Sequence, residues 1–105
     1  MDVRKLEALK AFTPEKMAKV SVFQTERLFY DLYCLEPGQA QKVHAHAGSD
    51  KVYLVVEGRA VVTIGDEERT LEEGEAAMAT AGVPHGVRAE SGRAVCLVVT
   101  TPPPG

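Results

Sequence analysis

The chain has 105 residues, of which 45% are hydrophobic, so it is long enough for one domain with its own core. A formal net charge of −3 offers no basic surface, and we therefore expect no nucleic-acid partner. No apolar run approaches the length that spans a bilayer, and residues 1–4 do not begin a signal peptide. We expect a soluble, cytoplasmic protein without a membrane segment.

Residues 1–19 are predicted to form a helical N-terminal segment. Four apolar side chains recur there at helical spacing: Val3, Leu6, Leu9 and Phe12. This pattern predicts an amphipathic helix of about three turns over residues 2–12. Thr13, Pro14 and Glu15 then resemble the start of another helix, with an N-cap, a proline in the first turn and an acid behind it. We therefore predict a second short helix through Ala18.

The pattern of residues 20–100 is that of strands. Branched and aromatic residues mark the candidate strands, which lie at 20–23, 28–35, 41–47, 51–57, 59–64, 68–71, 75–79, 86–90 and 94–100. Pro37 and Gly38 fit a type II turn between two of them. Many short strands without interleaved helices predict an all-β antiparallel sandwich or barrel. The proline-rich residues 101–105 are expected to form a flexible tail.

Several of these strands are apolar on both faces. In the strand predicted at 51–57, Val52, Leu54 and Val56 form one row, and Tyr53 and Val55 belong to the other. An antiparallel strand with one face in water would alternate between apolar and polar residues. We expect the N-terminal segment to cover part of the outer face and a second copy of the chain to cover the rest. The prediction is a homodimer.

Two compositional features concern redox state and stability. Cys34 and Cys96 each lie inside an apolar run, which favours two free, buried thiols over a disulfide or a reactive role. No Cys-x-x-Cys spacing exists, so a thiolate zinc site is not expected. The chain has no asparagine and only three glutamines, and this depletion of heat-labile amides predicts a thermostable protein.

All three histidines fall within two glycine-bounded stretches, residues 38–58 and 74–89. His44 and His46 are two residues apart, so on a strand both imidazoles would project from the same face. His85 lies in the second stretch. Neutral imidazole nitrogens about 2.0–2.1 Å from one ion are the usual start of a transition-metal site. A structural role for these histidines is the alternative.

The two stretches resemble the two sequence motifs of the cupins, small β-barrels that carry a metal in the barrel mouth. The residues that fit the motifs are Gly38, His44, His46 and Gly58 in the first, and Gly74, Gly82, Pro84 and His85 in the second. The motifs occur in the right order and span about half of the chain. The resemblance implies an all-β, cupin-type antiparallel barrel, also called a double-stranded β-helix or jelly roll, with short N-terminal helices.

Three positions depart from the cupin pattern. Thr80 and Ala89 replace a proline and an asparagine, and Lys51 stands where the family usually has a glutamate ligand. An ammonium about 6 Å from a divalent ion costs on the order of 5 kcal/mol at an effective dielectric of 20. Lys51 is therefore expected to be turned aside, paired or neutral. Asp50 could complete the ligand shell if a bulge near Gly48 re-aims its side chain.

The resemblance implies one divalent ion, iron, manganese, nickel or zinc, held by His44, His46 and His85 and by Asp50 or water. Such an ion acts in cupins on a small oxygen-rich substrate, as a Lewis acid or an oxygen-activating centre. Oxygenases, isomerases, decarboxylases and tailoring proteins of antibiotic or polyketide synthesis all fit this level of resemblance. Whether this chain is an enzyme stays open at this point.

Other residues and functions remain as candidates. Lys51, Tyr53 and Arg88 are candidate pocket residues, with Arg88 as a holder of an anionic group in the mouth and a solvated arginine as its alternative reading. A non-catalytic module that binds a small anion, with Lys51 as counter-charge, is the second functional hypothesis. A structural dimer with a vestigial site is the third.

Overall fold

Runs of branched and aromatic residues form nine strands and one short helix within residues 1–104, which the computed structural model describes. The elements in chain order are α1 (Leu6–Leu9), β1 (Ala18–Thr25), β2 (Leu28–Leu35), β3 (Ala40–His44), β4 (Asp50–Gly58), β5 (Ala60–Ile64), β6 (Glu67–Leu71), β7 (Ala76–Ala79), β8 (His85–Arg88) and β9 (Ala94–Thr101). Each predicted strand is present. The largest difference is at β3, which ends at His44, three residues earlier than predicted.

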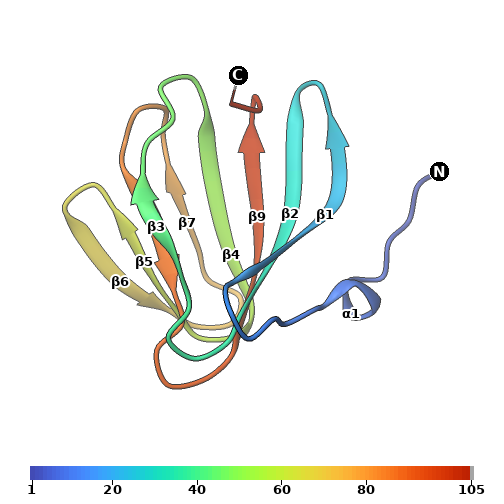
Figure 1. Cartoon of the computed structure of the whole chain (residues 1–105). Coiled ribbons are helices and arrows are strands. Elements are labelled where there is room, and N and C mark those ends of the chain that lie inside the picture. The colour runs from blue at the N-terminus through green and yellow to red at the C-terminus, as the bar shows by residue number, and fades with distance from the viewer. Residues whose placement is uncertain (105) are drawn as a thin grey trace.

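The strands form two sheets that face each other (Figure 1). The order in the five-stranded sheet is β1-β2-β9-β4-β7, and the order in the four-stranded sheet is β3-β8-β5-β6. Every strand pair within residues 1–104 is antiparallel. The predicted all-β antiparallel jelly roll is confirmed. No helix in this described part of the chain has the length and apolar character needed to cross a membrane.

The N-terminal segment differs from its prediction. The three-turn helix over residues 2–12 is wrong, because only α1, four residues long, is helical, and Lys10 already has an extended backbone. The second helix is also wrong, because β1 begins at Ala18. A helix this short is marginal in water, and Lys5 at its N-cap position gives no side-chain hydrogen bond. Thr13 donates its hydroxyl to the Lys16 carbonyl and does not cap a helix.

The apolar residues of that segment still cover part of the five-stranded sheet. Leu6, Leu9 and Phe12 pack against a cluster on the sheet's outer face, whose buried members are Val22, Leu32, Cys34 and Val95. Lys10 forms ion pairs with Glu7 and with Glu57 of β4. The helical spacing thus predicted which side chains are buried, although the backbone is mostly extended. In Figure 1 the segment lies beside the sheets and not between them.

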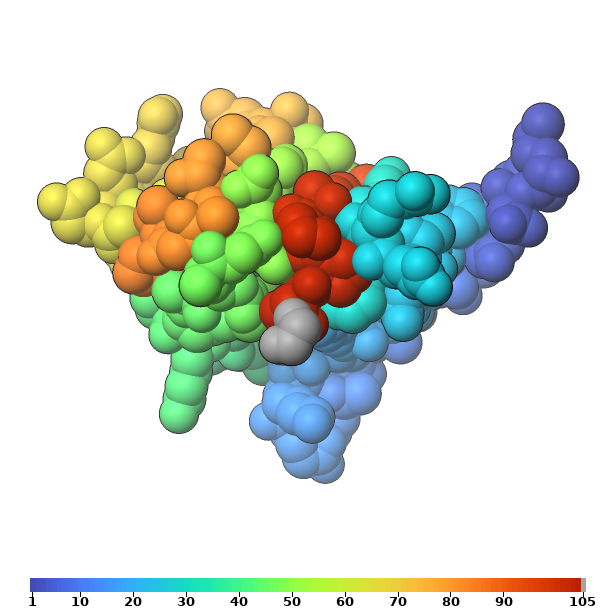
Figure 2. Space-filling model, turned by 90° about the horizontal axis from the view of Figure 1, so that it is seen from above, coloured from blue at the N-terminus to red at the C-terminus, as the bar shows by residue number. Residues whose placement is uncertain are grey.

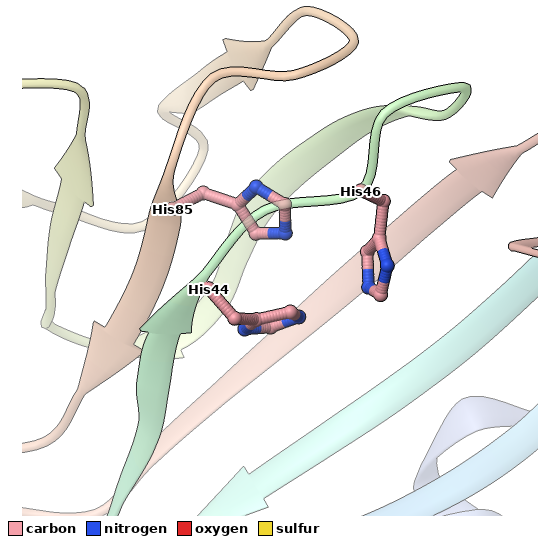
Figure 3. Close-up of side chains that lie close together, drawn as sticks. All are labelled: His44, His46 and His85. Atoms are coloured by element: carbon pink, nitrogen blue, oxygen red, sulfur yellow. The ribbon is translucent and has the colours of Figure 1, made fainter.

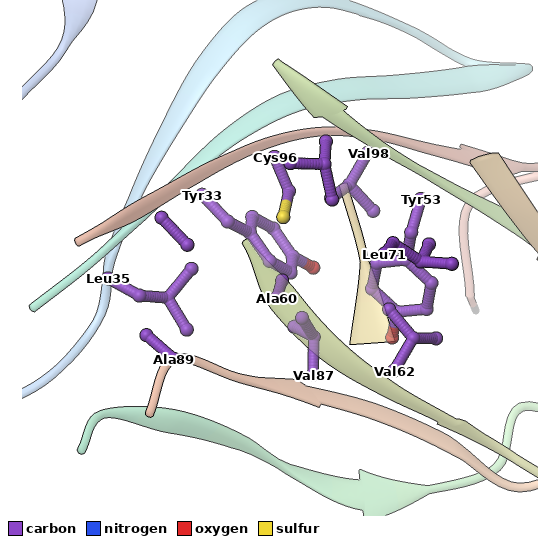
Figure 4. Packing of buried hydrophobic residues seen from close by; sticks show 12 residues of the cluster. Tyr33, Leu35, Tyr53, Ala60, Val62, Leu71, Val87, Ala89, Cys96 and Val98 are labelled. Carbon is purple, nitrogen blue, oxygen red and sulfur yellow. The ribbon is translucent and has the colours of Figure 1, made fainter. Parts of the chain in front are cut away.

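The main core lies between the two sheets (Figure 4). Its buried residues are Tyr33, Leu35, Tyr53, Val55, Ala60, Val62, Leu71, Val87, Ala89, Ala94, Cys96 and Val98. Cys96 belongs to this core and Cys34 to the outer cluster, so the two thiols lie on opposite faces of the five-stranded sheet. Both cysteines are free and buried, as predicted.

Two glycines show why the motifs need them. Gly38 has a φ of 85°, and Gln39 N donates to the Glu36 carbonyl at 3.0 Å, as the predicted type II turn requires. Gly58 has a φ of 74°, and a Cβ atom there would lie 2.2 Å from the Arg93 carbonyl oxygen. Any side chain at 58 would therefore push β4 away from the turn before β9.

The chain end packs beside the open end of the barrel. Thr101 is still part of β9 and pairs with Asp50, and the Ser49 hydroxyl donates to the Pro102 carbonyl at 2.6 Å. Viewed from above, the end of β9 lies between the segment before β4 and the β1–β2 turn (Figure 2). The predicted flexible tail of residues 101–105 thus begins inside a strand, and Gly105 lies outside the described residues.

Candidate metal centre

The three histidines come together at one end of the four-stranded sheet. His44 is the last residue of β3 and pairs directly with His85, the first residue of β8. His46 lies just beyond the strand, where its carbonyl accepts a hydrogen bond from Gly82 N at 2.9 Å. The ring centroids are 4.7 Å apart for His44–His46, 4.6 Å for His44–His85 and 5.8 Å for His46–His85. Figure 3 shows the three rings turned toward one another.

One nitrogen from each ring belongs to a set whose members all lie within 4.8 Å of one another. This is the one such group of His, Cys, Asp or Glu ligands found within residues 1–104. Nitrogens bound to one ion lie at most about 4.2 Å apart, twice the metal–nitrogen distance. Small rotations of the half-buried His44 and His46 rings would therefore bring the set onto one ion.

Hydrogen bonds to backbone carbonyls orient two of the rings. His44 Nδ1 lies 2.8 Å from the Lys42 carbonyl oxygen, and His85 Nδ1 lies 3.0 Å from that of Val83. A carbonyl only accepts, so each Nδ1 carries the proton and each Nε2 keeps a lone pair. His85 Nε2 is buried and has no hydrogen-bond partner among the described residues. A buried lone pair facing two other imidazoles fits a metal ion.

The surroundings of His46 and His85 favour the neutral imidazole, which is the form that binds metal. Burial lowers the pKa of His46, and the neighbouring His44, Lys51 and Lys19 lower it further. Burial also lowers the pKa of His85, and the hydrogen bond to the Val83 carbonyl opposes this shift only in part. The ligand form therefore persists to a lower pH than for a free histidine.

Lys51 faces the histidines from the opposite wall. It lies on β4, is 3% exposed and pairs with Thr100 of β9 and Ala79 of β7. Its ammonium lies 5.4 Å from the Tyr33 ring centroid and 5.8 Å from that of Tyr53. Burial and, to a smaller extent, the charge of Lys19 lower the pKa of Lys51 to about 8, against the opposing effect of Asp31. The side chain is thus inside the barrel and cationic at neutral pH.

A short polar chain runs through the core beside this lysine. The Tyr53 hydroxyl donates to Gln41 Oε1 at 2.8 Å, and Gln41 Nε2 donates to the Tyr33 hydroxyl at 3.0 Å. The Tyr53 ring lies 6.3 Å from the His85 ring. Burial raises the pKa of Tyr33 to about 12 and also raises that of Tyr53, so both phenols stay protonated. The tyrosines are therefore hydrogen-bond donors at every ordinary pH.

Two other candidates do not belong to the three-histidine set. The Asp50 carboxylate accepts a hydrogen bond from Ala81 N at 2.9 Å and is outside the three-histidine set. Arg88 alternates with the core residue Val87, so it points outward from the four-stranded sheet, where Glu68 and Glu90 hold its guanidinium. The alternation of β8 explains this position, since His85 and Val87 take the inner face.

Sequence reasoning missed three residues near the site, Gln41, Asp31 and Lys19. Asp31 is 5% exposed, and burial raises its pKa while Lys19 and Lys51 oppose the shift. These residues could be found only from the cross-strand register, which the sequence does not give. Lys19 pairs with Tyr33, and Asp31 occupies the inner-face row that continues through Val98 to Tyr53. Strand parity alone could not place these residues beside Lys51.

Comparison with known proteins agrees with the fold. The family model described as "Cupin domain" matches residues 31–101. An uncharacterized protein of Streptomyces coelicolor, SCO3923, is 39% identical over 72 residues, which cover 69% of this chain and 68% of that protein.

Solved structures give the same result. The crystal structure of TT1209 from Thermus thermophilus superposes with a TM-score of 0.95 at 59% identity, covering 97% of this chain and 98% of that one. An RmlC-like cupin protein from Desulfovibrio desulfuricans has a TM-score of 0.86 at 25% identity, and each chain is covered to 97%. The likeness therefore extends over nearly the whole of each chain.

Proposed function

The chain belongs to the cupin family, and from this premise we propose that it binds one divalent transition-metal ion through His44, His46 and His85 and presents it to a small oxygen-rich molecule. The carrying observation is the convergence of three imidazoles, with the buried Nε2 of His85 facing the other two rings and left without a partner among the described residues. A neutral three-histidine set suits iron, manganese, nickel or zinc.

The residues themselves would prepare the site. The Lys42 and Val83 carbonyls hold two imidazoles in the tautomer whose Nε2 can bind, and burial keeps His46 and His85 neutral. Three protein ligands leave coordination positions for a substrate. The ion, when bound, supplies Lewis acidity or oxygen activation to whatever molecule occupies those positions.

We infer a reaction of the oxygenase, isomerase or decarboxylase type, and a tailoring step in antibiotic or polyketide synthesis is compatible with it. The test is elemental analysis of the protein after incubation with manganese, iron, nickel and zinc, followed by an activity survey of small oxygen-rich acids and diketones with each loaded form. We expect one ion per chain. A wild-type protein that takes up none of the four metals would overturn the proposal.

A specific observation supports a second candidate, a non-catalytic module that binds a small anion. Lys51 is buried and cationic where the family has a glutamate ligand. A binding module and an enzyme differ in outcome. The module would bind an anion with equal affinity before and after metal removal, and it would show no turnover with any loaded form.

We also propose that the chain works as a homodimer. Across the outer face of the five-stranded sheet, the cross-strand row Tyr30–Val99–Val52–Met78 is entirely apolar. Met78 is 57% exposed, and the other three are half-buried. An apolar row that crosses four strands beyond the N-terminal segment is a surface that a second copy would cover.

Sedimentation tests the dimer. Analytical ultracentrifugation at micromolar concentration should give about twice the chain mass of 11.3 kDa. Val52→Lys places a charge in the centre of the row and should shift the protein toward monomer, while Gln24→Lys in β1 adds the same charge outside the row and should not. A wild-type monomer at that concentration would contradict the proposal.

A further inference from the structure

The wall opposite the histidines carries two lysines that converge on one tyrosine ring. Lys51 of β4 lies with its ammonium 5.4 Å from the Tyr33 ring centroid, and Lys19 of β1 lies with its ammonium 6.0 Å from the same centroid. Lys19 and Tyr33 are cross-strand partners, so both project from the inner face of the sheet. Two cations from separate strands therefore share one place in the barrel mouth.

The positive charge of this wall is only partly balanced within the described chain. Neither lysine has an ion pair within 4.0 Å among residues 1–104, and the Lys51 ammonium has no hydrogen-bond partner there. Asp31 is the one carboxylate whose charge opposes the shift at Lys51. A divalent ion on the histidines would add further positive charge, and the family's usual glutamate is absent. Lys51 is 3% exposed and has no counter-ion in contact, so this wall favours an anion from outside.

The polar chain in the core adds a directed donor. Tyr53 donates to Gln41, and Gln41 donates to the Tyr33 oxygen, so the Tyr33 hydroxyl keeps its own proton to give. Within the described residues that proton has no acceptor. The ring that both lysines approach thus carries a free O–H donor at its end. Ammonium groups and a neutral O–H together are the recognition set of a carboxylate.

We propose, building on the proposed metal function, that the site selects a small carboxylate with a second oxygen on the adjacent carbon, such as a 1,2-dicarboxylate or a 2-oxo acid. The carboxylate is held by Lys51, with Lys19 and the Tyr33 hydroxyl beside it, and the oxygens nearer the histidines face the metal position. A neutral diketone or diol would leave Lys51 unpaired, and a cation would be repelled by both lysines.

The experiment compares three molecules of one shape and different charge: oxalate, oxamate and oxamide. Each is titrated calorimetrically at pH 7 and low salt into the zinc-loaded protein, and again into the metal-free protein, with zinc content measured after each titration. We expect wild-type affinity to fall in the order oxalate, oxamate, oxamide. The step from the dianion to the neutral molecule should be about tenfold or more, as for one charge-assisted contact.

Variants of Lys51 locate the effect. Lys51→Met keeps the length of the side chain and removes its charge, so it should lower the oxalate-to-oxamide ratio about tenfold and leave the zinc stoichiometry unchanged. Lys51→Glu should move the two affinities in opposite directions, with tighter zinc and weaker oxalate. Lys5→Met removes an equal charge from the exposed N-terminal segment and should change neither.

The outcomes separate this inference from the proposed function. Failure of the wild type to take up any of manganese, iron, nickel and zinc overturns the metal function, and the charge series on the metal-free protein then decides the carboxylate site. Zinc binding with oxamide as tight as oxalate overturns the carboxylate site and leaves the metal function standing. An oxalate preference that survives unchanged in both Lys51→Met and Lys19→Met also overturns it.

Discussion

The two ends of the space between the sheets use the same strands for opposite purposes. Toward one end β2, β4 and β8 contribute Leu35, Val55 and Val87 to an apolar core. Toward the other the same three strands contribute Asp31, Lys51 and His85, all buried and all titratable. The apolar end stabilises the fold. The polar end carries buried titratable groups without ion-pair partners, and these groups lower the stability of the protein when no ligand is bound. We therefore expect mutations at the polar end to change mainly ligand binding, and mutations at the apolar end to change mainly the free energy of unfolding.

The largest effect is expected when a metal-binding histidine at the polar end is removed. His46→Ala removes one of three imidazoles and should weaken zinc binding by more than about 100-fold, since losing only a partner of a ligand costs 10–100-fold. Its folding should change little, because the ring is half-buried. Competition with a chromogenic chelator measures the affinity. Val43→Ala, at an exposed position of β3 three residues before His46, is the control. Equal zinc affinity in His46→Ala and wild type would remove His46 from the site.

The converse effect is expected at the apolar end. Leu35 is fully buried in the main core, and Leu35→Ala should lower the free energy of unfolding by about 3 kcal/mol through lost burial and the cavity left behind. Zinc stoichiometry should stay at one per chain. Urea denaturation of the metal-free protein measures the first quantity and elemental analysis the second. A Leu35→Ala protein that folds normally but cannot take up zinc would show that the two ends are coupled.

Removing the buried charge should stabilise the metal-free protein. The pKa of Lys51 falls from 10.5 to about 8 on folding, so holding the ammonium inside the barrel below pH 8 costs about 3 kcal/mol. Lys51→Met should therefore raise the free energy of unfolding by about 2 kcal/mol at pH 7, with some of the gain lost to imperfect packing. Lys16→Met, at an exposed position, should leave it unchanged. A destabilised Lys51→Met would mean that Lys51 has a favourable partner in the fold.

The sequence predicted the histidines and the strands but not the wall that faces them. His44, His46 and His85 are recognisable because rare residues recur at motif spacing. The alternation of side chains along β8 then predicts which of its residues face inward. Lys19 and Asp31 carry no such signal, since their meaning depends on the pairing of β1 with β2 and on its bulge between Ser21 and Phe23. Cross-strand register joins residues distant in the chain, and periodicity within one strand cannot supply it.

The prediction of helices in the N-terminal segment was wrong for a different physical reason. The helical spacing of Leu6, Leu9 and Phe12 correctly predicted that these side chains are buried on one side of the segment. They pack against the outer cluster. Burial can be met by an extended chain that crosses the strands, and packing on the sheet overrides helix propensity in so short a segment. Pattern thus identified the buried side chains but not the backbone that carries them.

The smallest expected effect is that of pH, and it separates the two ends once more. Burial lowers the folded pKa of His46 and His85, so the unfolded chain binds more protons than the folded one as pH drops below about 6.5. Stability of the metal-free protein is therefore full above pH 7 and is lost as pH falls toward the folded pKa values. Urea midpoints at pH 5.5 and 7.5 measure the change. The double variant His46→Gln/His85→Gln should lose most of this dependence, whereas Leu35→Ala should keep it at a lower overall stability.

Zinc occupancy should likewise persist below pH 6.5 before it declines, because both imidazoles stay neutral to a lower pH than free histidine. A wild-type protein whose midpoint rises on acidification would show that these two rings gain a favourable charge partner in the fold, opposite to what their burial implies.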